Sequence, residues 1–250
     1  MLRIIKMRIR QGFQTIRDIR KPVLTEKFRG LPVLDPEKCE KNCKACREVC
    51  PAKAITQKPL KLDMGKCTFC GDCQRACKEG AIRFTNNYKT AATRSDSLVI
   101  ESGKQNYEEY AVKVNREIKK MFARSLKFRQ VSAGGCNACE MELNACSNVN
   151  FDMARFGIEF VASPRHADGL VITGPLTENM ADALKDTYSS IPEPRIIILV
   201  GACAISAGIF ADSSALDRKF LDDRKPDLFI PGCPPHPLTF INGVLGLLGR

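Results

Sequence analysis

Long apolar runs are missing from this 250-residue sequence. A helix that crosses a membrane needs roughly 20 consecutive apolar residues, and no stretch approaches that length. The N-terminal residues MLRIIKMRIRQGF contain neither a long apolar core nor a small-residue cleavage site, so we expect no secretory signal. No nucleic-acid-binding motif is recognisable either. These absences argue against a membrane-spanning, exported or nucleic-acid-binding protein.

Cysteine, by contrast, is abundant, with 13 residues. In a protein without an export signal, cysteines are more often metal ligands than disulfide partners, and disulfides would leave one of an odd number unpaired. The formal net charge of +11 counts every cysteine as neutral. If twelve thiolates held three oxidised [4Fe–4S] clusters, the net charge would fall to about +5. We therefore interpret much of the basicity as compensation for bound clusters.

Eight of the cysteines form an internal repeat within residues 36–85. Two and then three residues separate the last three cysteines of each half, and an Ala-Ile pair follows both times, 27 positions apart. In two-cluster proteins with this spacing, the last cysteine of one half is a ligand of the other half's cluster. The repeat therefore predicts two [4Fe–4S] clusters. Their ligands are Cys39, Cys43, Cys46 and Cys77 for the first cluster, and Cys67, Cys70, Cys73 and Cys50 for the second.

A zinc-stabilised scaffold is the alternative interpretation of this repeat. Zinc sites more naturally use two separated C-x-x-C pairs, and the two halves are too small to bury a core, so we expect clusters to organise them. Two positions depart from the usual cluster-binding pattern. Three residues, Glu40 to Asn42, separate the first two cysteines, and Lys78 stands where proline is usual. We expect the extra residue to change the geometry or potential of the first cluster without preventing its binding.

Residues 126–250 alternate between short apolar runs and helical patterns. The run Ile196–Val200 is wholly apolar, as expected of a central parallel strand that is covered on both faces. This alternation predicts an α/β fold with an open, doubly wound parallel sheet of flavodoxin-like topology. The expected strands are Lys127–Ser132, Ile158–Ala162, Leu170–Thr173, Ile196–Val200 and Leu228–Ile230, and the expected helices include Glu178–Ser189 and Ser214–Asp222.

A third group of cysteines follows the strands of this predicted sheet. Cys136, Cys203 and Cys233 each come after a strand and a glycine-containing turn. Because sites in open α/β sheets form outside the carboxyl ends of the strands, we expect these thiolates at one pole. Cys139, near the start of a helix whose free N–H groups can bond cluster sulfurs, completes a third [4Fe–4S] site. Buried core positions are the alternative for Cys203 and Cys233, and the leftover Cys146 is interpreted as a small buried hydrophobe rather than a ligand.

These patterns divide the chain into four segments: a basic arm at 1–30, a small α+β two-cluster domain at 31–85, a linker with one amphipathic helix at 86–125, and the α/β domain at 126–250. Within the linker, NNYKTAATRSDS is expected to be irregular and the helix to run from about Asn106 to Arg124.

The basic arm contains nine Lys or Arg residues against Asp18 and Glu26. Its apolar residues, from Ile4 to Ile19, fit one broad helical stripe imperfectly. We expect the arm to lie on a membrane surface or in a groove of a partner protein. A solvated, frayed terminus is the alternative.

Four segments of the α/β part resemble a known family: GGCNACEMELNACSN, SPRHADGLVITGPLT, EPRIIILVGAC and FIPGCPP. They resemble the small subunit of energy-converting (group 4) [NiFe] hydrogenases, which is related to the 20 kDa subunit of respiratory complex I. Quinone-reducing relatives carry adjacent cysteines at the first position, whereas this chain has the spaced pair Cys136 and Cys139, as the hydrogenase branch does. The N-terminal part, from LRIIKMRIRQG through FRGLPVLDPEKC to the second cysteine block, resembles the two-cluster ferredoxin subunit of the same complexes. The chain is therefore similar to a fusion of two subunits that are usually separate.

The resemblance implies an electron-transfer subunit of a membrane-bound hydrogenase, an oxidoreductase complex, attached peripherally to the cytoplasmic side of the membrane through membrane subunits. Electrons would pass through three [4Fe–4S] clusters between an external carrier such as ferredoxin and the [NiFe] centre of a large partner subunit. That centre needs four thiolates in two C-x-x-C pairs, and only Cys146 remains unassigned here. This chain alone would therefore carry no complete catalytic site. The alternative is the equivalent subunit of a related complex that lacks [NiFe] and reduces a quinone or a sulfur compound.

Three polar residues lie close to the third group of cysteines in the sequence or in the family-like segments. Glu140 is either a hydrogen-bonding or proton-relay group beside the cluster, or an acid favoured at a helix N-terminus by the dipole. His166 and His236 either bond a cluster or face the partner subunit, or they make structural polar contacts.

Overall fold

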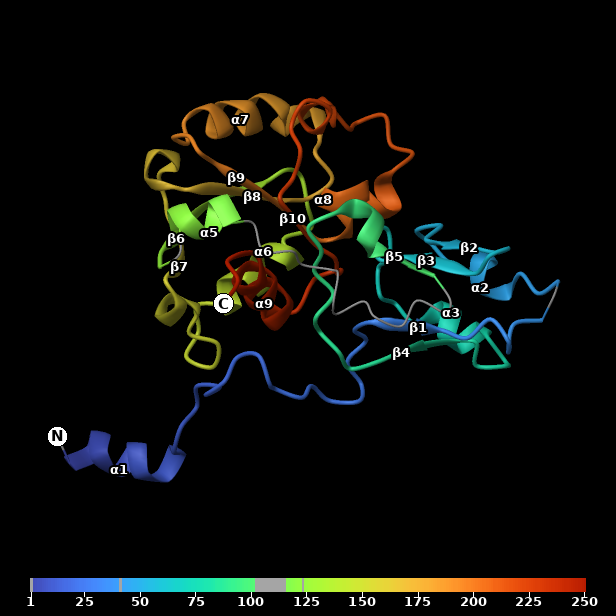
Figure 1. Cartoon of the computed structure of the whole chain (residues 1–250), viewed down its shortest axis with the longest axis horizontal. Helices are drawn as coiled ribbons and strands as arrows, with labels where there is room; N and C mark the ends of the chain where they lie inside the picture. Colours follow the sequence, from blue (N-terminus) through green and yellow to red (C-terminus); the bar gives the residue numbers. More distant parts are fainter. Residues whose placement is uncertain (1, 41, 102–115, 123) are drawn as a thin grey trace.

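The computed structural model describes residues 2–40, 42–101, 116–122 and 124–250, and it divides into a cysteine-rich α+β part and a larger α/β part (Figure 1). The α/β part has one five-stranded parallel sheet, with strands in the order β10-β9-β8-β6-β7. Numbered from its own first strand, this is the order 2-1-3-4-5 of flavodoxin-like proteins, so the predicted fold class is confirmed. The strands are β6 Leu126–Ser132, β7 Ile158–Phe160, β8 Gly169–Thr173, β9 Ile196–Val200 and β10 Leu228–Ile230.

Both faces of the sheet are covered, as the largely apolar sequences of the central strands require. All five residues of β8 and of β9 are buried. Ile197 and Leu199 face a cluster that includes Leu184 of helix α7 (Glu178–Ser189), whereas Ile198 faces the cluster formed with Phe240 of helix α9 (Pro237–Leu247). Figure 1 shows α7 on one side of the sheet and α9 on the other. The remaining described helices of this part are α5 Arg116–Phe122, α6 Ala138–Ala145 and α8 Ala202–Ser206.

The cysteine-rich part forms two small antiparallel sheets and two short helices. Strand β1 pairs with β4, and β3 lies between β2 and β5. The helices α2 and α3 begin 27 positions apart, in agreement with the repeat seen in the sequence. The bounds are β1 Pro32–Leu34, α2 Ala45–Glu48, β2 Ile55–Thr56, β3 Lys61–Asp63, α3 Asp72–Ala76, β4 Ile82–Phe84 and β5 Val99–Glu101.

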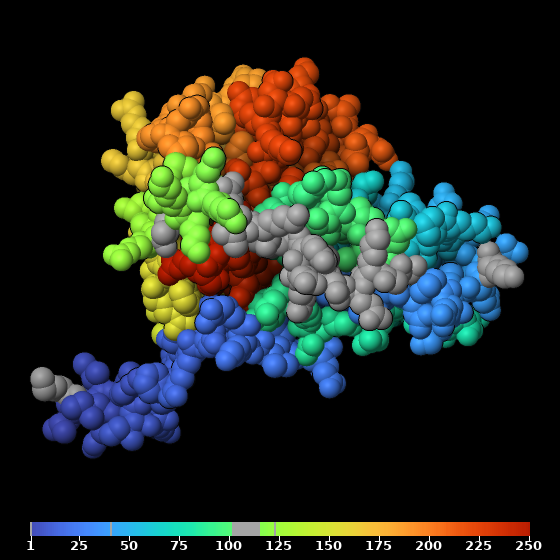
Figure 2. Space-filling view, in the orientation of Figure 1, coloured from blue at the N-terminus to red at the C-terminus, as the bar shows by residue number. Residues whose placement is uncertain are grey.

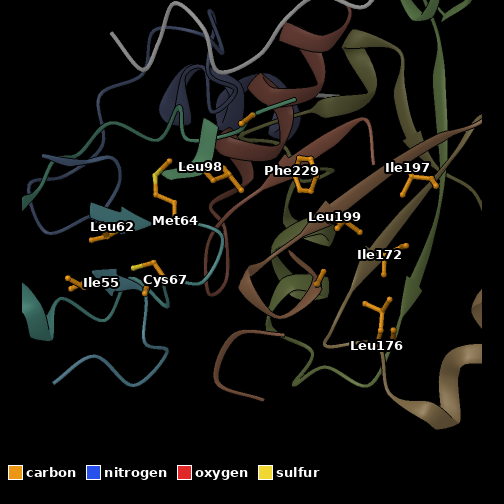
Figure 3. Close-up of a cluster of buried hydrophobic side chains, with 14 of the residues drawn as sticks. Ile55, Leu62, Met64, Cys67, Leu98, Ile172, Leu176, Ile197, Leu199 and Phe229 are labelled. Carbon is orange, nitrogen blue, oxygen red and sulfur yellow. The ribbon is translucent and has the colours of Figure 1, made fainter. Parts of the chain in front are cut away.

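The two parts share one apolar core, which holds them in a fixed relation. Leu62, Met64 and Leu98 of the cysteine-rich side lie in the same buried cluster as Leu199 and Phe229 of the sheet (Figure 3). Across this boundary the Ser206 hydroxyl donates to the carbonyl oxygen of Gly65 over 2.9 Å. The cysteine groups on the two sides are therefore positioned by packing.

Residues 86–97 are largely irregular, as predicted, but the segment is packed against the rest of the molecule. Tyr88, Ala91 and Ala92 are buried, Ala92 pairs with Phe229 at the edge of β10, and β5 completes a sheet with β3. Apolar residues within a polar-looking segment thus fill the boundary between the two parts. Residues 106–115 and 123 of the predicted linker helix lie outside the described residues, and helix α5, Arg116–Phe122, lies within its predicted range.

The predicted helix Ser214–Asp222 was wrong, since only a single 3₁₀ turn, Lys219–Leu221, occurs there. The backbone N–H of Ala215 donates to the Ser213 hydroxyl, and that of Lys219 donates to the Asp217 carboxylate. Such local side-chain acceptors compete with helical hydrogen bonds. The five expected strands of the α/β part agree with the structure to within two residues at each end, and the helix Glu178–Ser189 was predicted correctly.

The N-terminal arm is not one continuous helical stripe. Helix α1, Leu2–Gln11, has no buried residue and projects from the rest of the molecule (Figures 1 and 2). Beyond it the chain lies against the α/β part, where Ile19 is 2% exposed and the N–H of Ile16 donates to the carbonyl of Asn150. The stripe prediction failed for Ile16 and Ile19 because tertiary packing, not a continuing helix, buries them. No helix among the described residues has the length and apolar character needed to cross a membrane.

Candidate iron–sulfur sites

The first predicted ligand set surrounds one cavity at the end of the cysteine-rich part. Cys39, Cys43, Cys46 and Cys77 all line this cavity, which has a volume of about 260 Å³. Burial, reinforced by neighbouring thiolate charge, raises the pKa of Cys39 and of Cys46. The Gln57 side-chain amide donates to the carbonyl of Cys43 over 2.6 Å and lies 3.6 Å from the Cys46 sulfur. Cys77 comes from the other half of the repeat, so the structure brings the predicted set together.

The second predicted set lies deeper, towards the α/β part. Burial raises the pKa of Cys67 to about 12 and that of Cys73 to about 11, and Cys50 and Cys70 contribute like charge to both. Backbone N–H groups already point at the sulfurs of this repeat. Ala54 donates to Cys50 over 3.3 Å, and the repeat-related Ala81 donates to Cys77 over 3.2 Å. Such hydrogen bonds stabilise thiolate ligands and tune the group they hold.

The third set gathers at the carboxyl end of the parallel sheet, as the strand pattern predicted. Cys139 is neighboured by the thiols of Cys233, Cys203 and Cys136, although burial is the largest cause that raises its pKa to about 12. Burial likewise raises the pKa of Cys203 to about 11. The backbone of residue 201 approaches the Cys139 sulfur so closely that this position requires glycine. Gly201 has a φ of +91°, and an added Cβ would lie 2.6 Å from that sulfur.

The three sets form a row. Cys46 of the first set is among the neighbouring thiols that raise the pKa of Cys73 in the second set, and Cys70 of the second set is among those that raise the pKa of Cys233 in the third. The second set therefore lies between the other two. Cys70 and Cys233 belong to different parts of the molecule, so their proximity depends on the shared core described above.

The chemistry of these donor sets fits iron–sulfur clusters. Four thiols share each set, and both burial and mutual repulsion oppose their ionisation, so a cationic core is needed to hold them as thiolates. A single zinc ion binds sulfur at about 2.3 Å, which would draw the ligands close together. Among the described residues, no three Cys, His, Asp or Glu side chains are grouped closely enough for one metal ion. Four thiols in each set are the donors that a [4Fe–4S] cluster takes from a protein.

The polar residues considered with the third set have different surroundings. Glu140 is 7% exposed, and the Thr173 hydroxyl donates to its carboxylate over 2.5 Å, so this acid is held inside the pole next to Cys139. His166 is exposed in a short 3₁₀ turn. His236 accepts a hydrogen bond from the N–H of Leu238 at the start of α9, which is a structural contact.

Cys146 is kept apart from all three sets. It is fully buried among apolar side chains, its sulfur lies 3.4 Å from the carbonyl of Glu142, and burial raises its pKa to about 12. This agrees with the interpretation as a small buried hydrophobe.

Sequence reasoning missed two residues beside the thiol groups. Gln57 donates to the first set, and the half-buried Arg218 donates to the carbonyl of Cys203 over 3.2 Å. Neither belongs to a motif, and both come from outside the cysteine loops they contact, so no local signal identifies them.

Comparison with known proteins gave matches in both parts. Residues 136–247 match the family described as NADH ubiquinone oxidoreductase, 20 Kd subunit, and residues 60–83 match the 4Fe-4S binding domain. The chain is 39% identical over 127 residues to the probable membrane-bound hydrogenase subunit mbhJ of Pyrococcus furiosus, an alignment that covers 50% of this chain and 75% of that protein.

Two further relatives cover similar stretches. Formate hydrogenlyase subunit 7 of Escherichia coli is 39% identical over 142 residues, or 57% of this chain and 56% of the relative. A subunit of the NADH-quinone oxidoreductase of Clostridium beijerinckii is 42% identical over 114 residues, or 45% of this chain and 68% of the relative.

Proposed function

Because the chain belongs to the family of the 20 Kd subunit of NADH ubiquinone oxidoreductase, we propose that it is the electron-transfer subunit of a membrane-bound hydrogenase complex. Its relatives are subunits of oxidoreductases, and two of them are named as parts of hydrogen-linked complexes. The row of three four-cysteine groups is the observation that carries the proposal. A row of this kind suits a chain that conducts electrons from one end to the other.

The proposed ligands are the twelve cysteines of the three sets. Each set of four would bind one [4Fe–4S] cluster, and the bound clusters would supply one-electron transfer. The match to a 4Fe-4S binding domain supports cluster binding in the region of Cys67 to Cys77. The division into an arm, a two-cluster domain, a connecting segment and an α/β domain belongs to the same proposal. The backbone donors to the sulfurs of Cys50, Cys67 and Cys77 are the chain's own contribution to the stability of the reduced state.

The proposed partners follow from the two ends of the row. The first set lies at the far end of the cysteine-rich part, beside a cavity open to the surface, and is the proposed point of exchange with an external carrier such as ferredoxin. The third set, with Cys136 and Cys233 exposed, is the proposed contact with a large subunit that carries the [NiFe] centre. Membrane subunits would attach the chain peripherally on the cytoplasmic side.

Anaerobic purification of the chain with its natural partners tests this function. We expect about twelve irons and twelve sulfides per chain, three reducible EPR signals, and a co-purifying large subunit with two C-x-x-C pairs. Zinc in place of iron would overturn the cluster assignment.

The second candidate is the equivalent subunit of a complex without [NiFe] that reduces a quinone or a sulfur compound. The likeness to an NADH-quinone oxidoreductase subunit favours it, whereas the spaced pair Cys136 and Cys139 favours the hydrogenase. A co-purifying large subunit that lacks the two C-x-x-C pairs would decide for the second candidate.

A further inference from the structure

Arg218 joins two loops at the pole of the sheet where the third cysteine set lies. One nitrogen of its guanidinium donates to the carbonyls of Pro175 and Cys203, over 3.0 and 3.2 Å. The other donates to the carbonyls of Ala204 and Ile205, over 2.8 and 3.0 Å. These carbonyls belong to the turn after β8 and to helix α8. The Cys203 carbonyl also accepts from the N–H of Ala207, whereas Ala204 and Ile205 lie at the helix end, where carbonyls lack the usual helical partner.

The positive charge of Arg218 has no carboxylate partner in the described part of the chain. Burial lowers its pKa, and the one neighbouring group of negative charge that opposes this is the thiolate of Cys203. Reciprocally, the charge of Arg218 lowers the pKa of Cys203, against the larger effect of burial. A half-buried cation bonded only to neutral carbonyls is costly unless an anion compensates it.

A loaded third site would supply that anion. Four thiolates around an oxidised core of charge +2 leave a net charge of about −2, and one-electron reduction makes it about −3. A fixed cation beside the site stabilises the more negative, reduced state more than the oxidised state. Its effect is strong here because the partly buried environment screens charge less than water does.

We propose that Arg218 raises the reduction potential of the group held by Cys136, Cys139, Cys203 and Cys233, acting through its charge next to Cys203. The inference rests on the proposed function, since it assumes that these cysteines hold a cluster. A raised potential at this end of the row favours electron transfer from the second set, across the junction of Cys70 and Cys233, towards the pole of the sheet.

Arg195 offers a matched control within the same molecule. It stands directly before β9, whereas Cys203 follows that strand, so the five strand residues place it roughly 16 Å from the pole. Its side chain is also largely buried and donates to the carbonyls of Tyr188 and Ile191, but it pairs with Glu193. Its replacement removes a comparable set of hydrogen bonds far from the third site.

The test is an EPR-monitored redox titration of the full complex, with R218Q, R218K and R195Q beside the wild type. We expect R218Q to lower the potential of the third site by the equivalent of about a tenfold change in its reduction equilibrium, about 59 mV for one electron. R218K, which keeps the charge but cannot bridge four carbonyls, should stay close to the wild type, and R195Q should not change the potential.

An unchanged potential in R218Q would overturn the inference, and so would an R218K potential as low as that of R218Q, because geometry rather than charge would then be responsible. If R218Q fails to retain the cluster, R218K decides: a wild-type potential supports the charge effect and a lowered one contradicts it. Absence of the third signal from the wild type, by contrast, would refute the proposed function and leave Arg218 with nothing to act on.

Discussion

Replacement of Gly201 by alanine should remove the third cluster while leaving the other two. The backbone at Gly201, with φ of +91° and ψ of 154°, lies in a region that is essentially restricted to glycine. An alanine forced into it costs about 1–3 kcal/mol. The added Cβ would also lie 2.6 Å from the sulfur of Cys139.

The displacement needed to relieve this clash is larger than a metal site tolerates. Ordinary contact begins at 3.4 Å, so the sulfur must retreat by 3.4 − 2.6, or about 0.8 Å. Ligand distances in metal sites are reproduced to about ±0.2 Å. The Cys139 side chain has one rotatable torsion, and its backbone lies at the start of helix α6. Its sulfur therefore cannot move that far and remain within bonding distance of the cluster. We expect G201A to lose the fourth thiolate of the third site and, with it, the cluster.

Iron analysis and EPR on the anaerobic protein check this prediction. The expected iron content is about eight per chain instead of about twelve, with the signals of the first two sites unchanged. Gly80 provides the control, since it also has positive φ but an added Cβ there meets nothing within 4 Å. G80A should cost roughly 1–2 kcal/mol in backbone strain and retain all three signals. A G201A protein with full iron and an unaltered third signal would refute the reasoning.

Three further predictions concern other parts of the molecule. Cys203→Ser should abolish only the EPR signal of the third site. Cys146→Ala, at a buried position outside the three sets, should retain all three signals. Loss of all three signals in C203S would contradict the separation of the sites. Deletion of residues 2–11 should leave the melting temperature unchanged, because α1 has no buried residue. Ile19→Ala truncates a buried side chain and should lower the free energy of unfolding by about 2–4 kcal/mol. Thermal unfolding of both variants measures this difference. Burial lowers the pKa of His236, so its contribution to stability is complete above about pH 6.5 and falls as the pH drops towards the folded-state pKa. Asparagine at this position keeps a helix-capping acceptor but does not titrate, so H236N should flatten the dependence of the melting temperature on pH below about 6.5.

The cysteine repeat shows how much of the candidate site could be predicted from the sequence. The pairing of Cys77 with the loop of Cys39, and of Cys50 with the loop of Cys67, was predicted from spacing, and the structure brings each set together. Spacing works here because a short loop has few ways to present three thiolates to one group. The polar segment after residue 85 shows the opposite case. Its few apolar residues gave no period, yet Ala92 is fully buried, because the surface that covers it belongs to β10.

The sequence alone predicted the three groups of four cysteines, the flavodoxin-like strand order and the position of Cys146 outside those groups. These depend on loop spacing and on apolar periodicity, which are local properties of the chain. The order of the three sets, the proximity of Cys70 to Cys233 and the position of the Arg218 cation next to Cys203 became visible in the folded structure. Those relations arise where apolar residues from distant segments share one core, and burial against a distant surface leaves no periodic mark in the segments that it joins.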